Sequence, residues 1–196
     1  MDGVGTVLGI KAKDGIVLAG EKRLTYDGFV LSRNVRKVHP ITNHIGIGVT
    51  GLMGDAQVLL KMLRFEAKNY ELQHNRRIRV RAMAKMASII LYSYKLMPMM
   101  TETIIAGVDD KGPQLFVLDP VGSYIEDKYA ALGSGGPLAL GILEKEYSDN
   151  MSVKEASELA VSALEAALKR DAMSGDGIDL LIITKDGYEL KEYLFK

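Results

Sequence analysis

Ionisable and hydroxyl side chains stand where predicted strands and helices of this chain end. A charged triplet at 21–23 follows an apolar strand, Lys37 interrupts a strand-like run, and Asp171 and Ser174 lie just past a helix. Such side chains are of the types that transfer protons in hydrolases. Taken singly, each also has a structural explanation, since a lysine can protect a sheet edge and an acid or a serine can close a polar turn.

The common catalytic and cofactor motifs are missing from the chain. There is no cysteine, and His39, His44 and His74 stand at a strand end, in a turn and at a helix end, without the H-E-x-x-H spacing of a zinc site. The nucleophile elbow G-x-S-x-G is absent. The glycine-rich segment 133–136 lacks the lysine and the spacing of a phosphate-binding loop. These three histidines are therefore expected at the surface or in turns.

The elements that must position the polar residues follow from hydrophobic periodicity and turn signals. Strands are expected at 4–12, 16–19, 35–41, 45–49, 103–108, 115–118, 123–129, 179–184 and 188–193. Helices are expected at 55–72, 80–96, 137–147 and 152–170, the last of them opening with a capping box of Ser152 and Glu155. The order is strands, two helices, strands, two helices, strands.

This order predicts an α+β fold with four layers. Each helix pair needs a sheet face on which to bury its apolar stripe, and the strands suffice for two sheets. An αββα sandwich, with helices outside two stacked sheets, satisfies both needs.

Length and composition are those of one soluble globular domain. The chain has 196 residues, 47% of them hydrophobic and 26% charged, with 25 basic and 25 acidic side chains. The balanced charge argues against a nucleic-acid-binding module and allows self-association. No apolar stretch approaches the ~20 residues of a membrane span, and the acidic start lacks the pattern of a signal peptide. A cytoplasmic protein is expected.

Over nearly its whole length the chain resembles the β subunits of the archaeal-type 20S proteasome. The segments that carry the resemblance are Gly9-Ile10, 14–19 leading into 21–23, Arg36-Lys37-Val38, 51–57, Gly133-Ser134-Gly135 and 170–179. The resemblance implies the αββα sandwich of the N-terminal-nucleophile hydrolases, in agreement with the layers expected from the element order. It also implies a threonine endopeptidase, in which a threonine exposed by autocleavage attacks the peptide carbonyl while its own α-amino group accepts the proton.

The resemblance gives the polar residues roles in such a site. Lys37 matches the lysine beside the nucleophile, Glu21 the acid that holds it, and Gly51 the backbone N–H that stabilises the oxyanion. Ser134, Asp171 and Ser174 match the polar group that orients the amine and relays protons.

Substrate binding is implied in the same way. Four residues match the lining of the substrate groove, which favours hydrophobic side chains at the cleavage site. They are Thr25, Val35, Val49 and Met53.

The nucleophile departs from the family pattern, which opens with a Gly-Thr junction and a run of threonines. Here Gly5-Thr6 precedes Gly9, and counting back from Glu21 and Lys37 puts Gly5 at the nucleophile position. Two interpretations follow: Thr6 becomes the nucleophile after cleavage of a leader at 1–5, with 6–196 as one β-type domain, or the subunit is an inactive structural member of a mixed β ring. The geometric demand of nucleophilic attack favours the second.

Partners are also implied by the resemblance. They are α-subunit rings and other β subunits in heptameric rings of a stacked four-ring particle, a separate ATPase unfoldase and unfolded polypeptides, with no metal or cofactor for this subunit. Basic residues at 76–85 crowd the start of a helix, where the macrodipole disfavours cations. They are expected either as a solvated face or in contact with an acidic neighbour.

Overall fold

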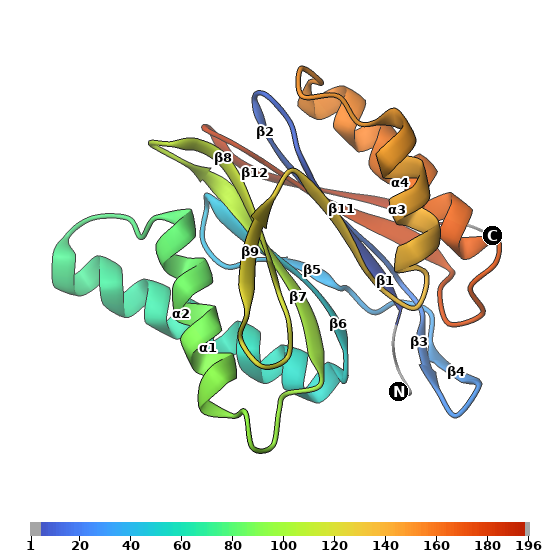
Figure 1. Ribbon diagram of the computed structural model, residues 1–196, viewed down its shortest axis with the longest axis horizontal. Helices are drawn as coiled ribbons and strands as arrows, with labels where there is room; N and C mark the ends of the chain where they lie inside the picture. The colour runs from blue at the N-terminus through green and yellow to red at the C-terminus, as the bar shows by residue number, and fades with distance from the viewer. Residues whose placement is uncertain (1–4, 195–196) are drawn as a thin grey trace.

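Two five-stranded antiparallel sheets form the centre of the computed structural model, which describes residues 5–194 (Figure 1). The first sheet has the order β10-β1-β2-β11-β12 and the second β5-β6-β7-β8-β9. The first contains β1 (Thr6–Lys11), β2 (Gly15–Glu21), β10 (Tyr129–Gly133), β11 (Gly177–Thr184) and β12 (Gly187–Leu194). The second contains β5 (Val38–Pro40), β6 (Ile45–Gly51), β7 (Thr101–Asp109), β8 (Gly112–Leu118) and β9 (Tyr124–Asp127).

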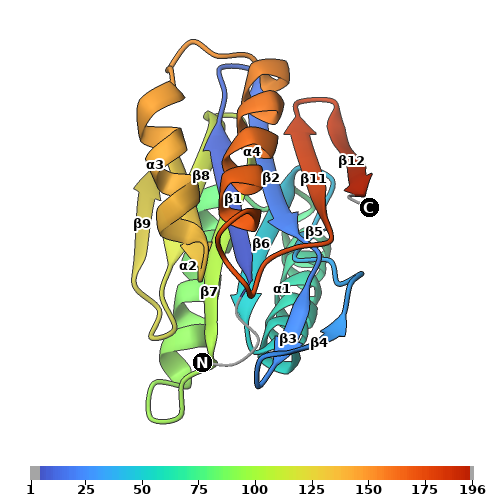
Figure 2. The same cartoon turned by 90° about the vertical axis from the view of Figure 1, so that its right-hand side faces the viewer.

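Helices cover the outer face of each sheet, which gives four layers. The helices α3 (Gly136–Glu146) and α4 (Val153–Leu168) pack on the first sheet, and α1 (Met53–His74) and α2 (Val80–Ser93) on the second. Figure 2 shows α3 and α4 in front of the first sheet and α1 and α2 behind the second. A third apolar cluster joins the two inner sheet faces. The predicted αββα sandwich is thus confirmed.

Local sequence signals place the ends of these elements. The Ser152 hydroxyl accepts the Glu155 N–H at 3.3 Å, and Glu155 Oε2 accepts the Ser152 N–H at 2.7 Å, so the predicted capping box opens α4. Proline at the first turn of α3 fits there because the first N–H groups of a helix need no intrahelical acceptor.

Removing the cap is expected to weaken α4. We expect Ser152→Ala to lower the free energy of unfolding by about 1 kcal/mol, measured by urea denaturation, because the N–H of Glu155 loses its acceptor. Ser157→Ala is the control on the same helix, since the Ser157 hydroxyl only binds the Val153 carbonyl one turn back. Equal losses for the two variants would contradict the cap's role.

The region predicted as one strand at 123–129 is two strands in different sheets. Strand β9 pairs with β8 in the second sheet, whereas β10 pairs with β1 in the first. The chain crosses from one sheet to the other at Lys128, whose neighbours on both sides are extended. Periodicity cannot show this change, because both segments read as strand in either sheet.

One further strand is shorter than the sequence predicts, and one hairpin was not predicted. The strand expected at 35–41 shrinks to β5, so Lys37 precedes the strand instead of interrupting it. A hairpin that the sequence analysis did not include is formed by β3 (Leu24–Tyr26) and β4 (Phe29–Ser32). Its turn residues Asp27 and Gly28 both have positive φ, 48° and 74°, and an Asp-Gly pair of this kind was the available signal.

Among residues 5–194 no helix is both long enough and apolar enough to cross a membrane.

Candidate active site

The predicted site residues meet where β1 begins, at the ends of β2, β6 and β10 and beside the segment between α4 and β11. Lys37 and Glu21 form an ion pair there, both fully buried. The other carboxylate oxygen of Glu21 accepts the N–H groups of Arg23 at 2.7 Å and Gly175 at 2.9 Å. A carboxylate with this many donors is held rigidly, and it fixes the lysine in turn.

Burial is the largest influence on the protonation of both partners. Desolvation raises the pKa of Glu21 and lowers the pKa of Lys37, and in each case the charge of the partner opposes the shift. Each charge therefore depends on the other to remain in the protein interior.

The backbone position at the start of β1 decides which side chain faces this pair. A Cβ atom built on Gly5 would lie 2.5 Å from Lys37 Nζ, and closer still to Glu21 Oε1. Both contacts are with the ends of side chains that the ion pair holds in place, so Glu21 and Lys37 would have to shift to admit a Cβ atom. A side chain at position 5 would therefore point directly at the Lys37–Glu21 pair, and Gly5 offers none.

Thr6 directs its hydroxyl to other partners. Thr6 Oγ1 accepts the Gly135 N–H at 3.0 Å and lies 2.8 Å from Ser174 Oγ. Successive residues of an extended chain face opposite sides, so Thr6 presents only its backbone N–H to Glu21, at 3.2 Å. The threonine is fully buried.

The three residues expected to relay protons come together beside Thr6. Ser134 Oγ and Ser174 Oγ each donate to Asp171 Oδ2 at 2.6 Å. Because the Ser174 proton goes to Asp171, the Thr6 hydroxyl donates to Ser174. The result is a directed chain of hydrogen bonds from Thr6 to a carboxylate.

Gly51 ends β6 with a φ of +112°, where a Cβ atom would collide with the Met100 carbonyl oxygen. Only glycine fits this position. It directly follows Thr50, whose hydroxyl accepts the Gly5 N–H at 3.1 Å and donates to the Gly5 carbonyl at 3.0 Å. The sequence prediction did not include Thr50, and its only signal was its place next to Gly51.

Three of the four predicted groove residues share one hollow. Val35, Val49 and Met53 line a cavity of about 290 Å³ whose wall also includes His39. Thr25 is not among the lining residues; it is buried on β3, with its hydroxyl 3.5 Å from Met173 Sδ. The substrate role of all four remains a prediction.

The loop between α4 and β11 is tied down next to the site by a further ion pair. Arg23 Nε donates to Asp176 Oδ2 at 2.8 Å, and this hydrogen bond raises the pKa of Arg23 and lowers that of Asp176. It holds the end of the segment that carries Asp171 and Ser174.

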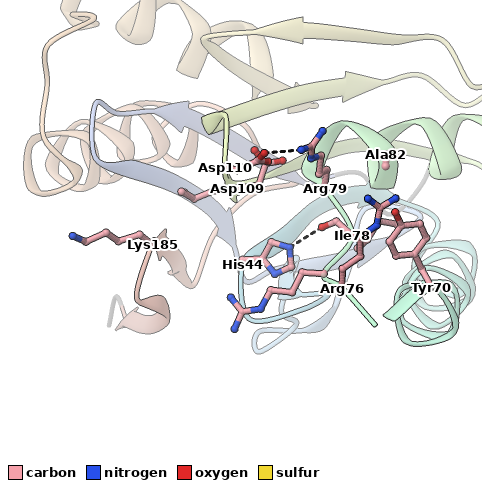
Figure 3. A pocket seen from close by; sticks show the side chains of 11 residues that line it. His44, Tyr70, Arg76, Ile78, Arg79, Ala82, Asp109, Asp110 and Lys185 are labelled. Carbon is pink, nitrogen blue, oxygen red and sulfur yellow. Dashed lines mark hydrogen bonds and ion pairs between the residues drawn. The ribbon is translucent and has the colours of Figure 1, made fainter. Parts of the chain in front are cut away.

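The basic segment 76–85 lies elsewhere, and several of its charges have partners within the chain. Arg79 binds Asp110 at 2.6 Å beside a cavity of about 480 Å³ that Arg76 and Lys185 also line (Figure 3). Arg81 pairs with Glu126 and, like Lys85, lies over an aromatic ring. The basic side chains of the segment are exposed, as expected of a solvated face, and two of them also form surface ion pairs within the chain.

His44 lies in a turn, as expected, and it is also buried. Its Nε2 is 2.8 Å from the Ile78 carbonyl oxygen (Figure 3). His74 stands exposed at the end of α1, with its ring tilted by 46° against that of Tyr70. No group of three or more His, Asp or Glu side chains in residues 5–194 could hold a metal ion.

Two stacked antiparallel sheets between helix layers, with the first strand starting at a buried lysine–carboxylate pair, define an αββα sandwich of the N-terminal-nucleophile hydrolase type. Within that class the chain belongs to the proteasome subunit family, whose profile, described as "Proteasome subunit", matches residues 1–183.

Relatives in three archaea are similar over nearly the whole chain. Proteasome subunit beta 1 of Staphylothermus marinus is 67% identical over 192 residues, covering 98% of this chain and 90% of the relative. Proteasome subunit beta 1 of Desulfurococcus amylolyticus is 61% identical, covering 98% and 95%. Proteasome subunit beta 2 of Caldivirga maquilingensis is 50% identical over 184 residues, covering 94% and 92%.

Proposed function

We propose that this chain is a β subunit of the inner rings of a 20S proteasome core particle and that it supplies no nucleophile of its own. It would shape a chamber in which unfolded polypeptides are cut, next to α-subunit rings and to catalytic β subunits of another kind. The particle would work in the cytoplasm with a separate ATPase unfoldase. The high identity to named β subunits over the whole chain supports the ring position.

The inactive assignment rests on one observation: a side chain at position 5 would face Lys37 and Glu21, and Gly5 has no side chain. The Lys37–Glu21 pair faces position 5, where the chain has no hydroxyl. Within residues 5–194 the hydrogen bonds of Lys37 Nζ go to Glu21 and Arg23 and not to Thr6. A lysine activates a nucleophile only at short range, and a misplacement by one residue moves the hydroxyl to the other face of the strand.

The competing function is a threonine endopeptidase that uses Thr6 after cleavage of the Gly5–Thr6 bond. Two contacts favour it: the Thr6 nitrogen is 3.2 Å from Glu21 Oε1, and the Thr6 hydroxyl donates toward Asp171 through Ser174. Against it stand the full burial of Thr6 and its orientation away from Lys37. In that case residues 1–5 would form a removed leader and 6–196 the domain; residues 1–4 lie outside the described residues.

Intact mass of the subunit in the assembled particle separates the two functions. We expect a chain that retains residues preceding Thr6 and takes up no epoxyketone or β-lactone probe. A chain that begins at Thr6 and carries one equivalent of probe would refute the inactive assignment. As a control, the same probe must label a catalytic β subunit in the same particle.

A further inference from the structure

The Thr50 hydroxyl holds both backbone polar groups of a single residue. It accepts the Gly5 N–H at 3.1 Å and donates to the Gly5 carbonyl at 3.0 Å, with Thr50 itself buried. A neighbouring strand satisfies a residue of an antiparallel pair in the same way, through one N–H and one C=O. Thr50 therefore replaces a strand neighbour for Gly5.

Gly5 needs such a replacement because the described pairing of β1 begins only at the next residue, Thr6. The ladder between β1 and β10 begins with Thr6 opposite Gly133. Gly133 adopts a φ of +90° and lies against Gly5, since a Cβ atom on Gly133 would collide with the Gly5 carbonyl oxygen. Glu102 Oε2 fixes this glycine by accepting its N–H at 2.8 Å. The space around Gly5 is thus closed on the side of β10.

The same contacts hold each of the two groups that would react in cleavage of the Gly5–Thr6 bond. Cleavage needs Thr6 Oγ1 to attack the Gly5 carbonyl carbon. The carbonyl is held by Thr50 of β6 in the second sheet, whereas the hydroxyl is held by Gly135 before α3 and by Ser174 before β11. The carbonyl is thus held by a strand of the second sheet, and the hydroxyl by two segments that flank strands of the first sheet.

We propose that Thr50 is a positioning residue that clamps the chain at Gly5 and protects the residues before Thr6 from removal by an aminopeptidase. This inference rests on the proposed inactive function, in which the subunit keeps the residues before Thr6. Such a contact is not general to the buried threonines of this sheet, because Thr101 and Thr103 on β7 have no hydrogen-bond partner for their hydroxyls within residues 5–194.

Hydrogen exchange on the assembled particle tests the clamp. In Thr50→Val, which keeps the shape and removes the hydroxyl, we expect the Gly5 amide to exchange about tenfold faster or more, because its acceptor is gone. An added aminopeptidase should also trim residues 1–4 faster than in the unaltered chain. Thr50→Ser retains the hydroxyl and should restore both readouts.

Thr103→Val is the matched control, because it makes the same substitution at a buried hydroxyl with no partner among the described residues. It should leave exchange at Gly5 and trimming unchanged. Unchanged exchange in Thr50→Val, or equal acceleration in Thr103→Val, would overturn the clamp. These two results concern only the clamp: if the unaltered subunit keeps the residues before Thr6, the proposed inactive function still holds. If the unaltered chain already begins at Thr6, the inactive function itself is refuted.

Discussion

Replacing Gly5 by threonine, with Val4 replaced by glycine, is expected to create an active subunit. The new hydroxyl would face Lys37, toward which a Cβ atom on Gly5 points at 2.5 Å, and the glycine at position 4 would reproduce the Gly-Thr junction of the family pattern. The Glu21 carboxylate and the Lys37 amine, which the ion pair holds in place, must shift to admit it. We expect a processed chain whose first residue is the threonine introduced at position 5, and a peptidase rate about 10²-fold or more above that of the unaltered subunit.

Intact mass and cleavage of a fluorogenic peptide, both on assembled particles, measure this gain. The catalytic partner subunit must carry an inactivating substitution, so that the background rate is low. Val4→Gly with Gly5→Ala is the control, since it adds the Cβ atom at the same place without a hydroxyl. A correctly assembled Gly5→Thr particle that stays unprocessed and unlabelled would show that the site lacks more than a nucleophile.

Removing the carboxylate of Glu21 is expected to cost more stability than removing the cap of α4. In Glu21→Ala the fully buried Lys37 loses its counter-charge, and the N–H groups of Thr6, Arg23 and Gly175 lose their acceptors. We expect the free energy of unfolding to fall by about 3–5 kcal/mol in urea denaturation, the range for a buried ion pair that loses one partner.

Two comparisons isolate the electrostatic cause. Glu21→Gln with Lys37→Met removes both charges and keeps much of the volume, so the double variant should be more stable than Glu21→Ala alone. Glu189→Ala breaks an exposed pair with Lys191 and should change stability by no more than about 0.5 kcal/mol. If Glu21→Ala unfolds at the same urea concentration as Glu189→Ala, the buried pair does not stabilise the fold.

The layers of the fold follow from sequence because amphipathic periodicity is local. Helices at 53–74 and 153–168 and the hairpin of β1 and β2 lie within a few residues of their predicted bounds. The strand at 123–129 was wrong for the opposite reason: its two halves join different sheets, and sheet membership depends on partners far away in the chain.

In the candidate site, too, some residues could be predicted from the sequence and others were found only through contacts between distant segments. Residue types and spacing pointed to Glu21, Lys37 and Asp171 through the family resemblance, and the structure brings the first two into contact. No sequence motif pointed to Thr50. Thr50 matters because folding brings it to Gly5, 45 residues away in the chain, where it forms two hydrogen bonds.

By itself, the sequence determined an αββα sandwich, the residues of a hydrolase-like site and an irregular register at Gly5-Thr6. Only the tertiary structure decided which way each residue of that register faces. A side chain at position 5 would point toward Lys37, but Gly5 has none. The hydroxyl of Thr6 points toward Ser174. The physical reason is that strand pairing fixes the face of every side chain, and pairing is a property of distant segments brought together by folding.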